Sequence, residues 1–118
     1  MLNENAKKWV AALRSGKYKQ ATMYLRTPFG FCCLGVACDL YMKEKGMVWD
    51  GDDGAFVTEM HKTLPRSVMD WLGVNEQQGK YWADDGEHML TSDNDETGKN
   101  FDQIADIIES EPEGLFVK

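Results

Sequence analysis

The spacing of apolar residues predicts a helix near the start of the chain, over residues 4–15. Its apolar positions follow the i, i+3, i+4, i+7 pattern of one helix face: Ala6, Trp9, Val10 and Leu13. Asn3 or Asn5 can cap the first turn, and Gly16 can end the helix.

Three more helices are predicted further along the chain. The segment from Leu34 is apolar nearly all round, which is typical of a buried helix, and polar residues followed by Gly46 end it. Pro65 opens a short helix that Gly73 ends. Residues 101–110 carry the clearest apolar stripe, formed by Phe101, Ile104, Ala105 and Ile108.

Shorter segments with β-favouring residues predict three hairpins. Residues 21–26 alternate in polarity, a Thr-Pro-Phe-Gly turn follows, and the return strand begins at Phe31. Segments 47–58 and 80–91 each carry an Asp-Asp-Gly tip between β-prone runs, which is a strong hairpin signal. The polar segment 90–100 is predicted to be a loop.

The order of these elements predicts a single α+β domain over residues 1–118, in which hairpins form an antiparallel sheet and about four helices pack mainly on one face. A chain of 118 residues with 42% hydrophobic content can fold around one core. No apolar run approaches the roughly 20 residues of a membrane span, and the N-terminus lacks the apolar core of a secretory signal. With an odd number of cysteines, these features predict reduced thiols, a cytoplasmic location and no membrane partner.

Charge is distributed unevenly along the chain, whose net charge is −7. Residues 1–47 carry eight Lys or Arg and three Asp or Glu, a balance of +5, whereas residues 48–118 carry five and seventeen, a balance of −12. Either the two halves attract each other across the folded surface, or the acidic part meets a basic partner. Direct binding of nucleic acid is disfavoured, because phosphate contacts need clustered Lys and Arg.

The stretch GFCCLGVACDL contains Cys32, Cys33 and Cys38. Adjacent residues of a strand point to opposite faces, and structural zinc usually takes four ligands in spaced pairs, so no metal site is predicted. An apolar environment also raises the pKa of a thiol and disfavours a nucleophile. We interpret the cysteines as core residues and expect no cofactor. A cysteine-dependent enzyme that pairs Cys32 or Cys38 with His61 is the least favoured hypothesis.

The stretch DNDETG partly matches a calcium-binding loop. Asp93, Asp95, Thr97 and Gly98 fit the first half of the pattern, but the position that needs a bidentate acid is Ile104. An EF-hand is therefore not predicted. A loose cation site at Asp93 and Asp95 and a solvated loop before the last helix remain the two alternatives.

Four aspartates lie at the predicted hairpin tips: Asp52, Asp53, Asp84 and Asp85. Turn tips are exposed to water, so these carboxylates lack the desolvation that acid–base catalysis requires, and we assign no catalytic residues. The aspartates are instead the candidate contacts for a basic partner.

A basic and aromatic segment precedes the cysteines, and it could hold a flat, anionic small molecule such as a nucleotide through charge and stacking. Ordinary packing of the hairpin is the alternative interpretation. The candidate ligand-binding residues are Arg14, Lys17, Lys19, Tyr24, Arg26 and Phe29.

The blocks WVAALRSGKYKQ, FCCLGVACDL, LPRSVMDWLGV and NFDQIADIIE occur in this order over most of the chain. In this respect the sequence resembles a family of small uncharacterised proteins of tailed bacteriophages and prophages. The resemblance implies expression in the cytoplasm of a bacterial host and a gene that is dispensable for building the particle, but it supplies no catalytic residues. The favoured hypothesis is a non-enzymatic accessory protein that binds a host protein through an acidic surface, and the alternative is a protein that binds a small molecule.

Overall fold

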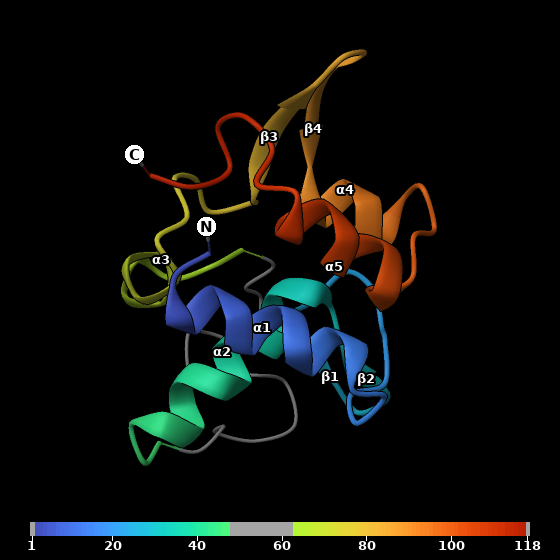
Figure 1. Ribbon diagram of the computed structural model, residues 1–118. Helices are drawn as coiled ribbons and strands as arrows, with labels where there is room; N and C mark the ends of the chain where they lie inside the picture. The colour runs from blue at the N-terminus through green and yellow to red at the C-terminus, as the bar shows by residue number, and fades with distance from the viewer. Residues whose placement is uncertain (1, 48–62, 118) are drawn as a thin grey trace.

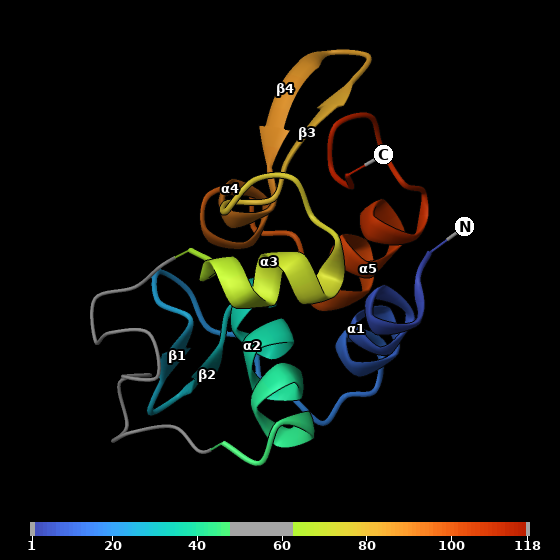
Figure 2. The same ribbon diagram turned by 90° about the vertical axis from the view of Figure 1, so that its left-hand side faces the viewer.

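The computed structural model describes residues 2–47 and 63–117, and within them five helices surround one core (Figure 1). The predicted α+β class and the single compact domain are confirmed. Helix α2 (Cys33–Glu44) packs against α1 (Glu4–Arg14) and α3 (Arg66–Leu72). The hairpin of β3 (Lys80–Ala83) and β4 (Gly86–Met89) stands out from the helices in both views (Figure 2). No helix in the described ranges is long and apolar enough to cross a membrane.

Helix α1, Glu4–Arg14, forms where the apolar spacing predicts it. The Asn3 side chain caps it by accepting a hydrogen bond from the Ala6 N–H at 2.9 Å. The four predicted apolar residues are buried and pack against α2 and α5. Among them, the Trp9 indole N–H donates to the Cys33 carbonyl at 2.9 Å, so this large side chain is buried with its polar atom satisfied.

Helix α2, Cys33–Glu44, is the buried helix that the sequence predicts. Cys32 precedes it in an extended conformation, and its Sγ accepts a hydrogen bond from the Gly35 N–H at 3.4 Å. Gly35 lets the helix approach the preceding segment closely, because a Cβ atom at this position would lie 1.7 Å from the Leu25 carbonyl oxygen. This contact fixes the start of α2 against residues 25–31.

The other predicted helices also form. Helix α3, Arg66–Leu72, follows Pro65 and ends at Gly73, whose φ of 77° is left-handed. Helix α5, Phe101–Glu109, begins with a capping box between Asn100 and Gln103 and buries its whole predicted stripe.

The strands form two separate sheets of two strands each in the described residues, and not the one sheet that the sequence predicts. Strand β1, Arg26–Thr27, pairs with β2, Gly30–Phe31. The predicted strand over 21–26 is reduced to its last residue. Met23 has a φ of 80°, which interrupts the extended backbone. In addition, the Phe31 N–H donates to the Lys19 carbonyl and the Phe31 carbonyl accepts from the Ala21 N–H, so these groups of Phe31 are already bonded. The predicted hairpin 47–58 lies almost wholly outside the described residues.

The second sheet joins β3, Lys80–Ala83, to β4, Gly86–Met89, in an antiparallel hairpin. Helix α4, Leu90–Asp95, follows at once, so the prediction of a loop over 90–100 is wrong for its first six residues. The positions of α4 that face the core are Leu90, Asp93 and Asn94. Two of these three are polar, which is why the apolar pattern gave no sign of a helix.

Candidate binding surface

The β3–β4 hairpin is fixed at its base by a buried hydrogen bond. The Tyr81 hydroxyl donates to Asp93 Oδ2 on α4 at 2.5 Å, and both side chains are buried. Burial, and next the Asp93 carboxylate, raise the pKa of Tyr81, so the hydroxyl keeps its proton. The Tyr81 ring also stacks on His88 of the neighbouring strand, with ring centroids 5.3 Å apart. One face of the hairpin is therefore packed against the domain.

The opposite face presents the exposed Trp82 between two glutamates. In the sheet Trp82 lies directly across from Glu87, and on its other side it forms an antiparallel bridge with Glu113, whose carbonyl accepts the Trp82 N–H at 2.8 Å. Residues directly opposite each other in antiparallel pairs share one face of the sheet. Glu87, Trp82 and Glu113 thus form a row across three chain segments, and the indole is 46% exposed.

Two more carboxylates lie at the tip of this hairpin, where the sequence analysis places them. Asp84 and Asp85 form the turn between β3 and β4, and both are exposed. Asp85 Oδ1 lies 2.6 Å from His88 Nε2, and this hydrogen bond lowers the pKa of Asp85. We call Trp82, Asp84, Asp85, Glu87 and Glu113 the acidic hairpin surface. The other two candidate aspartates, Asp52 and Asp53, lie outside the described residues.

The C-terminal segment extends this surface. It runs beside β3 in both views (Figures 1 and 2), and Gly114 contacts the pyrrole side of the indole, where a Cβ would lie 3.1 Å from Trp82 Cδ1. Leu115 is buried and holds the segment in place. Residues 111–114, with Phe116 and Val117, line a hollow of about 370 Å³ in this segment.

The aspartates of the partial calcium motif point in different directions. Asp93 faces the interior and accepts from Tyr81, with Lys99 Nζ 3.9 Å from its other oxygen. Asp95 is exposed and accepts a hydrogen bond from Asn94 Nδ2 at 2.8 Å. Because residues two apart in a helix lie on different faces, these carboxylates do not converge. Within the described ranges, no three His, Cys, Asp or Glu side chains gather as a metal site would require.

Asn94 is the centre of a buried polar cluster that the sequence analysis missed. Its Oδ1 accepts hydrogen bonds from Gln20 Nε2 at 2.9 Å and from the Cys33 N–H at 3.2 Å, and its Nδ2 donates to the Ala21 carbonyl at 2.9 Å. These contacts join residues 20–21, the start of α2 and helix α4. The cluster therefore has a structural role, and it supports the base of the hairpin.

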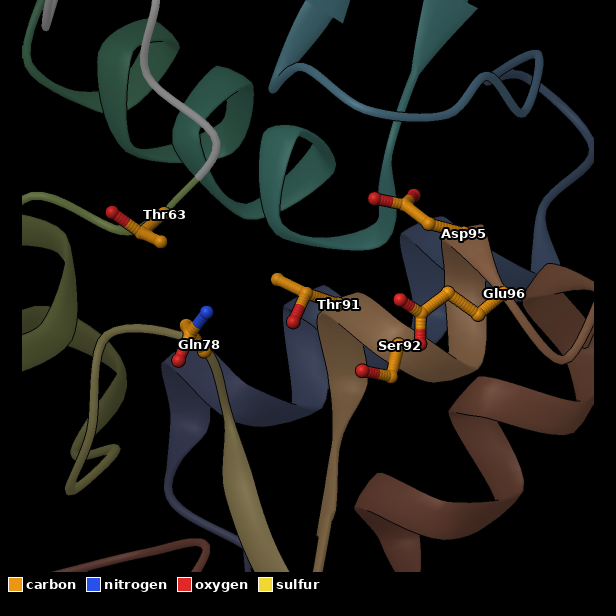
Figure 3. A pocket seen from close by; sticks show the side chains of 6 residues that line it. All are labelled: Thr63, Gln78, Thr91, Ser92, Asp95 and Glu96. Carbon is orange, nitrogen blue, oxygen red and sulfur yellow. The ribbon is translucent and has the colours of Figure 1, made fainter.

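A polar hollow of about 190 Å³ lies between α4 and the segments before α3 and β3. Figure 3 shows its side chains, which comprise three hydroxyls, one amide and two carboxylates: Thr63, Thr91, Ser92, Gln78, Asp95 and Glu96. The two carboxylates add negative charge near the base of the hairpin. The hollow can accept hydrogen-bonding groups, and its carboxylates disfavour an anion.

The predicted ligand-binding residues do not gather around one cavity in the structure. Arg14 is held by α5, because its guanidinium lies 2.8 Å from Asp106 and 3.0 Å from Glu109. These ion pairs join the basic and acidic parts of the chain, as one of the two charge interpretations expects. Phe29 is 75% exposed at the β1–β2 turn, and the Arg26 guanidinium lies over the Phe31 ring at 5.9 Å. Tyr24 is half-buried and Lys19 is exposed.

Lys17 lies in a different setting, beside Tyr18. A hollow of about 360 Å³ has an apolar lining from α1 and α2 and polar groups from two lysines, one serine and one tyrosine: Ala11, Ala12, Leu40, Lys17, Lys43, Ser15 and Tyr18. The Tyr18 hydroxyl donates to the buried Asp39 Oδ2 at 2.5 Å, and Lys43 lies 3.0 Å from the same oxygen. Burial, and next Asp39, raise the pKa of Tyr18 to about 12. The i, i+4 spacing of Asp39 and Lys43 was the only sign of this cluster in the sequence.

All three cysteines are free and buried, as interpreted from the sequence. Burial raises the pKa of Cys32 to about 12 and raises the pKa values of Cys33 and Cys38 well above the ordinary range of a thiol. A protonated, enclosed thiol is a poor nucleophile. His61, the suggested partner, lies outside the described residues.

The fold and this surface define a small α+β domain with a projecting acidic hairpin. The chain belongs to the family described as domain of unknown function (DUF8296), whose model matches residues 1–112. Comparison with curated proteins and with solved structures gave no match.

Proposed function

We propose that this protein is a non-enzymatic binding protein that captures a protein partner through the acidic hairpin surface. The observation that carries the proposal is the row of Glu87, Trp82 and Glu113, in which a tryptophan that is 46% exposed lies between two glutamates. Exposed tryptophans are enriched among the residues that dominate binding energy in protein interfaces. The partner that suits this surface is a basic one.

The charge around Trp82 supports this choice of partner. Asp84 and Asp85 add two exposed carboxylates at the tip of the same hairpin, where Asp85 is bonded to His88, and Lys80 is the lysine of the hairpin. Complementary charge accelerates association and rejects partners of the same sign. A negatively charged ligand such as nucleic acid is disfavoured at this surface for the same reason.

The resemblance to phage and prophage proteins suggests the setting. In our proposal the protein is a phage or prophage accessory protein in the cytoplasm of the bacterial host, and its partner is a host protein. Carboxylates that occupy a basic groove would compete with the phosphates of that groove's usual ligand. This part of the proposal rests on the sequence blocks alone.

The state of the thiols supports a binding role over the cysteine-dependent alternative. Cys32, Cys33 and Cys38 are each buried, and their raised pKa values keep them protonated at neutral pH. Cys33 Sγ lies 3.6 Å from the Leu90 carbonyl inside the core. These thiols contribute packing, which is the ordinary role of a buried cysteine.

A second candidate function is the binding of a small anionic molecule in the hollow beside Tyr18. Two ammonium groups, those of Lys17 and Lys43, border an apolar lining there. Asp39 neutralises part of this charge, since it pairs with Lys43 at 3.0 Å. A thermal-shift screen with nucleotides and other organic anions tests this candidate, because a ligand that binds the native state raises the melting temperature.

The experiment for the main proposal compares two variants with the same change in charge. The tagged protein captures its partner from a bacterial host lysate. Capture is then compared between a surface variant, Asp84→Asn, Asp85→Asn and Glu113→Gln, and a control variant, Glu4→Gln, Asp70→Asn and Asp102→Asn. All six carboxylates are exposed, and the control residues lie on α1, α3 and α5.

We expect the surface variant to capture about tenfold less of the partner, or less still, and the control to capture as much as the natural protein. Long-range attraction by net charge would be weakened equally in both variants, so a difference between them reports on the surface itself. Equal capture by the two variants would refute the acidic hairpin surface as the contact.

A further inference from the structure

We infer that Trp82, Glu87 and Glu113 form a site for one cationic side chain of the partner, an arginine in preference to a lysine. In the free protein, Lys80 of the same chain takes the place of that cation. This inference deepens the proposed function and rests on it, since it names the chemistry that the acidic hairpin surface recognises.

Glu87, Trp82 and Glu113 lie side by side in three neighbouring chain segments. Glu87 pairs with Trp82 from β4, and Glu113 pairs with it from the C-terminal segment. The Trp82 backbone N–H donates to the Glu113 carbonyl, and a Cβ at Gly114 would lie 3.1 Å from Trp82 Cδ1, so the main chain of the C-terminal segment positions the indole. A cation above an aromatic ring gains from the ring quadrupole, and flanking carboxylates add charge and hydrogen-bond acceptors.

Lys80 lies beside both Trp82 and Glu87. Its Nζ lies 5.8 Å from the centroid of the Trp82 ring and 3.3 Å from Glu87 Oε2. The molecule therefore already shows a cation in the chemical setting that we propose for the partner. The Lys80 side chain is 40% exposed, and exposed ion pairs of lysine contribute little stability, so an incoming group can displace it at low cost.

A guanidinium suits this site better than an ammonium. An ammonium is strongly hydrated and makes point contacts, whereas a guanidinium is planar, stacks on aromatic faces and bonds carboxylates with two N–H groups at once. An indole with a glutamate in each of the two neighbouring chain segments offers both contacts to a guanidinium. An arginine of the partner should therefore outcompete Lys80.

The test uses a blocked tetra-arginine peptide as the probe, with tetra-lysine and tetra-glutamate peptides for comparison. Binding is followed by the NMR signal of the Trp82 indole N–H, assigned through the Trp82→Phe variant. We expect this signal to shift with tetra-arginine, less with tetra-lysine and not with tetra-glutamate.

Variants then separate the site from general attraction. Trp82→Ala should weaken tetra-arginine binding about fivefold, and Lys80→Met should strengthen it about threefold. Phe29→Ala removes a more exposed aromatic side chain, 75% exposed against 46% for Trp82, from the β1–β2 hairpin and should leave binding unchanged. Glu113→Gln keeps the indole and should also weaken binding, which guards against a Trp82→Ala variant that disturbs the hairpin.

Unchanged affinity in Trp82→Ala, or a Trp82 signal that does not move, would overturn the inference. The proposed function would still stand if the three-carboxylate surface variant lost the partner while Trp82→Ala retained it, because the acids would then bind without this site. If neither the surface variant nor Trp82→Ala lost the partner, both the inference and the proposed function would be refuted.

Discussion

The hydroxyl of Tyr81 donates to the buried carboxylate of Asp93 at 2.5 Å, and this bond joins the β3–β4 hairpin to helix α4. Tyr81 lies on β3, one residue before Trp82, and Asp93 is buried on α4. The orientation of the acidic hairpin surface thus depends on a hydrogen bond that is buried in the domain.

Replacing Tyr81 by Phe should destabilise the protein by about 1.5–3 kcal/mol, because a buried carboxylate loses a hydrogen bond and keeps its cost of desolvation. Urea unfolding measures the loss. Tyr41→Phe, on the half-buried Tyr41 of α2, serves as the comparison and should have a smaller effect. Equal losses in the two variants would remove the special role of the Tyr81–Asp93 bond.

Alkaline pH should destabilise the fold through Tyr18. Its pKa is raised to about 12 in the folded state, compared with about 10 in an unfolded chain. The folded state therefore holds this proton more tightly, so the associated stability is complete below pH 10 and is lost as the pH rises from about 10 to 12. Unfolding curves over this range should fall more steeply for the natural protein than for Tyr18→Phe. Parallel curves would show that Tyr18 is not linked to folding in this way.

Gly35→Ala should prevent stable folding, with a loss of about 3 kcal/mol or more, because the new Cβ would lie 1.7 Å from the Leu25 carbonyl oxygen. Gly46→Ala is the control. At that position φ is 72°, but among the described residues no atom beyond its chain neighbours lies within 4 Å of the added carbon, so the left-handed backbone conformation sets the cost, at about 1 kcal/mol. Circular dichroism with thermal melting separates the two, and a stable Gly35→Ala variant would contradict the close approach.

The thiols should resist modification in the native state. Cys32, Cys33 and Cys38 are buried, and their pKa values are raised by burial, so a disulfide reagent such as DTNB should react slowly with the folded protein and rapidly in urea. A thiol that reacts within seconds in the native protein would reopen the hypothesis of a cysteine-dependent enzyme.

Sequence patterns predicted those parts of the fold in which local spacing and packing agree. The sequence predicts α1, α2 and α5 correctly as helices, because apolar residues fill their core-facing positions. In α4, Asp93 and Asn94 take those positions and obtain their stability from partners far along the chain, including Tyr81 and Gln20. No local pattern carries that information.

The candidate site was predictable to a similar degree. Turn chemistry placed Asp84 and Asp85 at an exposed tip, but the row around Trp82 depends on its bridge to Glu113, 31 positions away in the sequence. In the same way, the sequence predicts Arg14 as a ligand-binding residue, but the packing of α1 on α5 places two carboxylates beside its guanidinium. Long-range pairing decides which charged side chains remain available to a partner.

The most direct test of the central claim is the hydrogen-exchange footprint of the complex with the captured partner. Amides of β3, β4 and residues 111–117 should gain protection on binding, while those of the β1–β2 hairpin at residues 26–31 should not change. Protection confined to residues 26–31 or to the hollow beside Tyr18 would contradict the acidic hairpin surface as the site of binding.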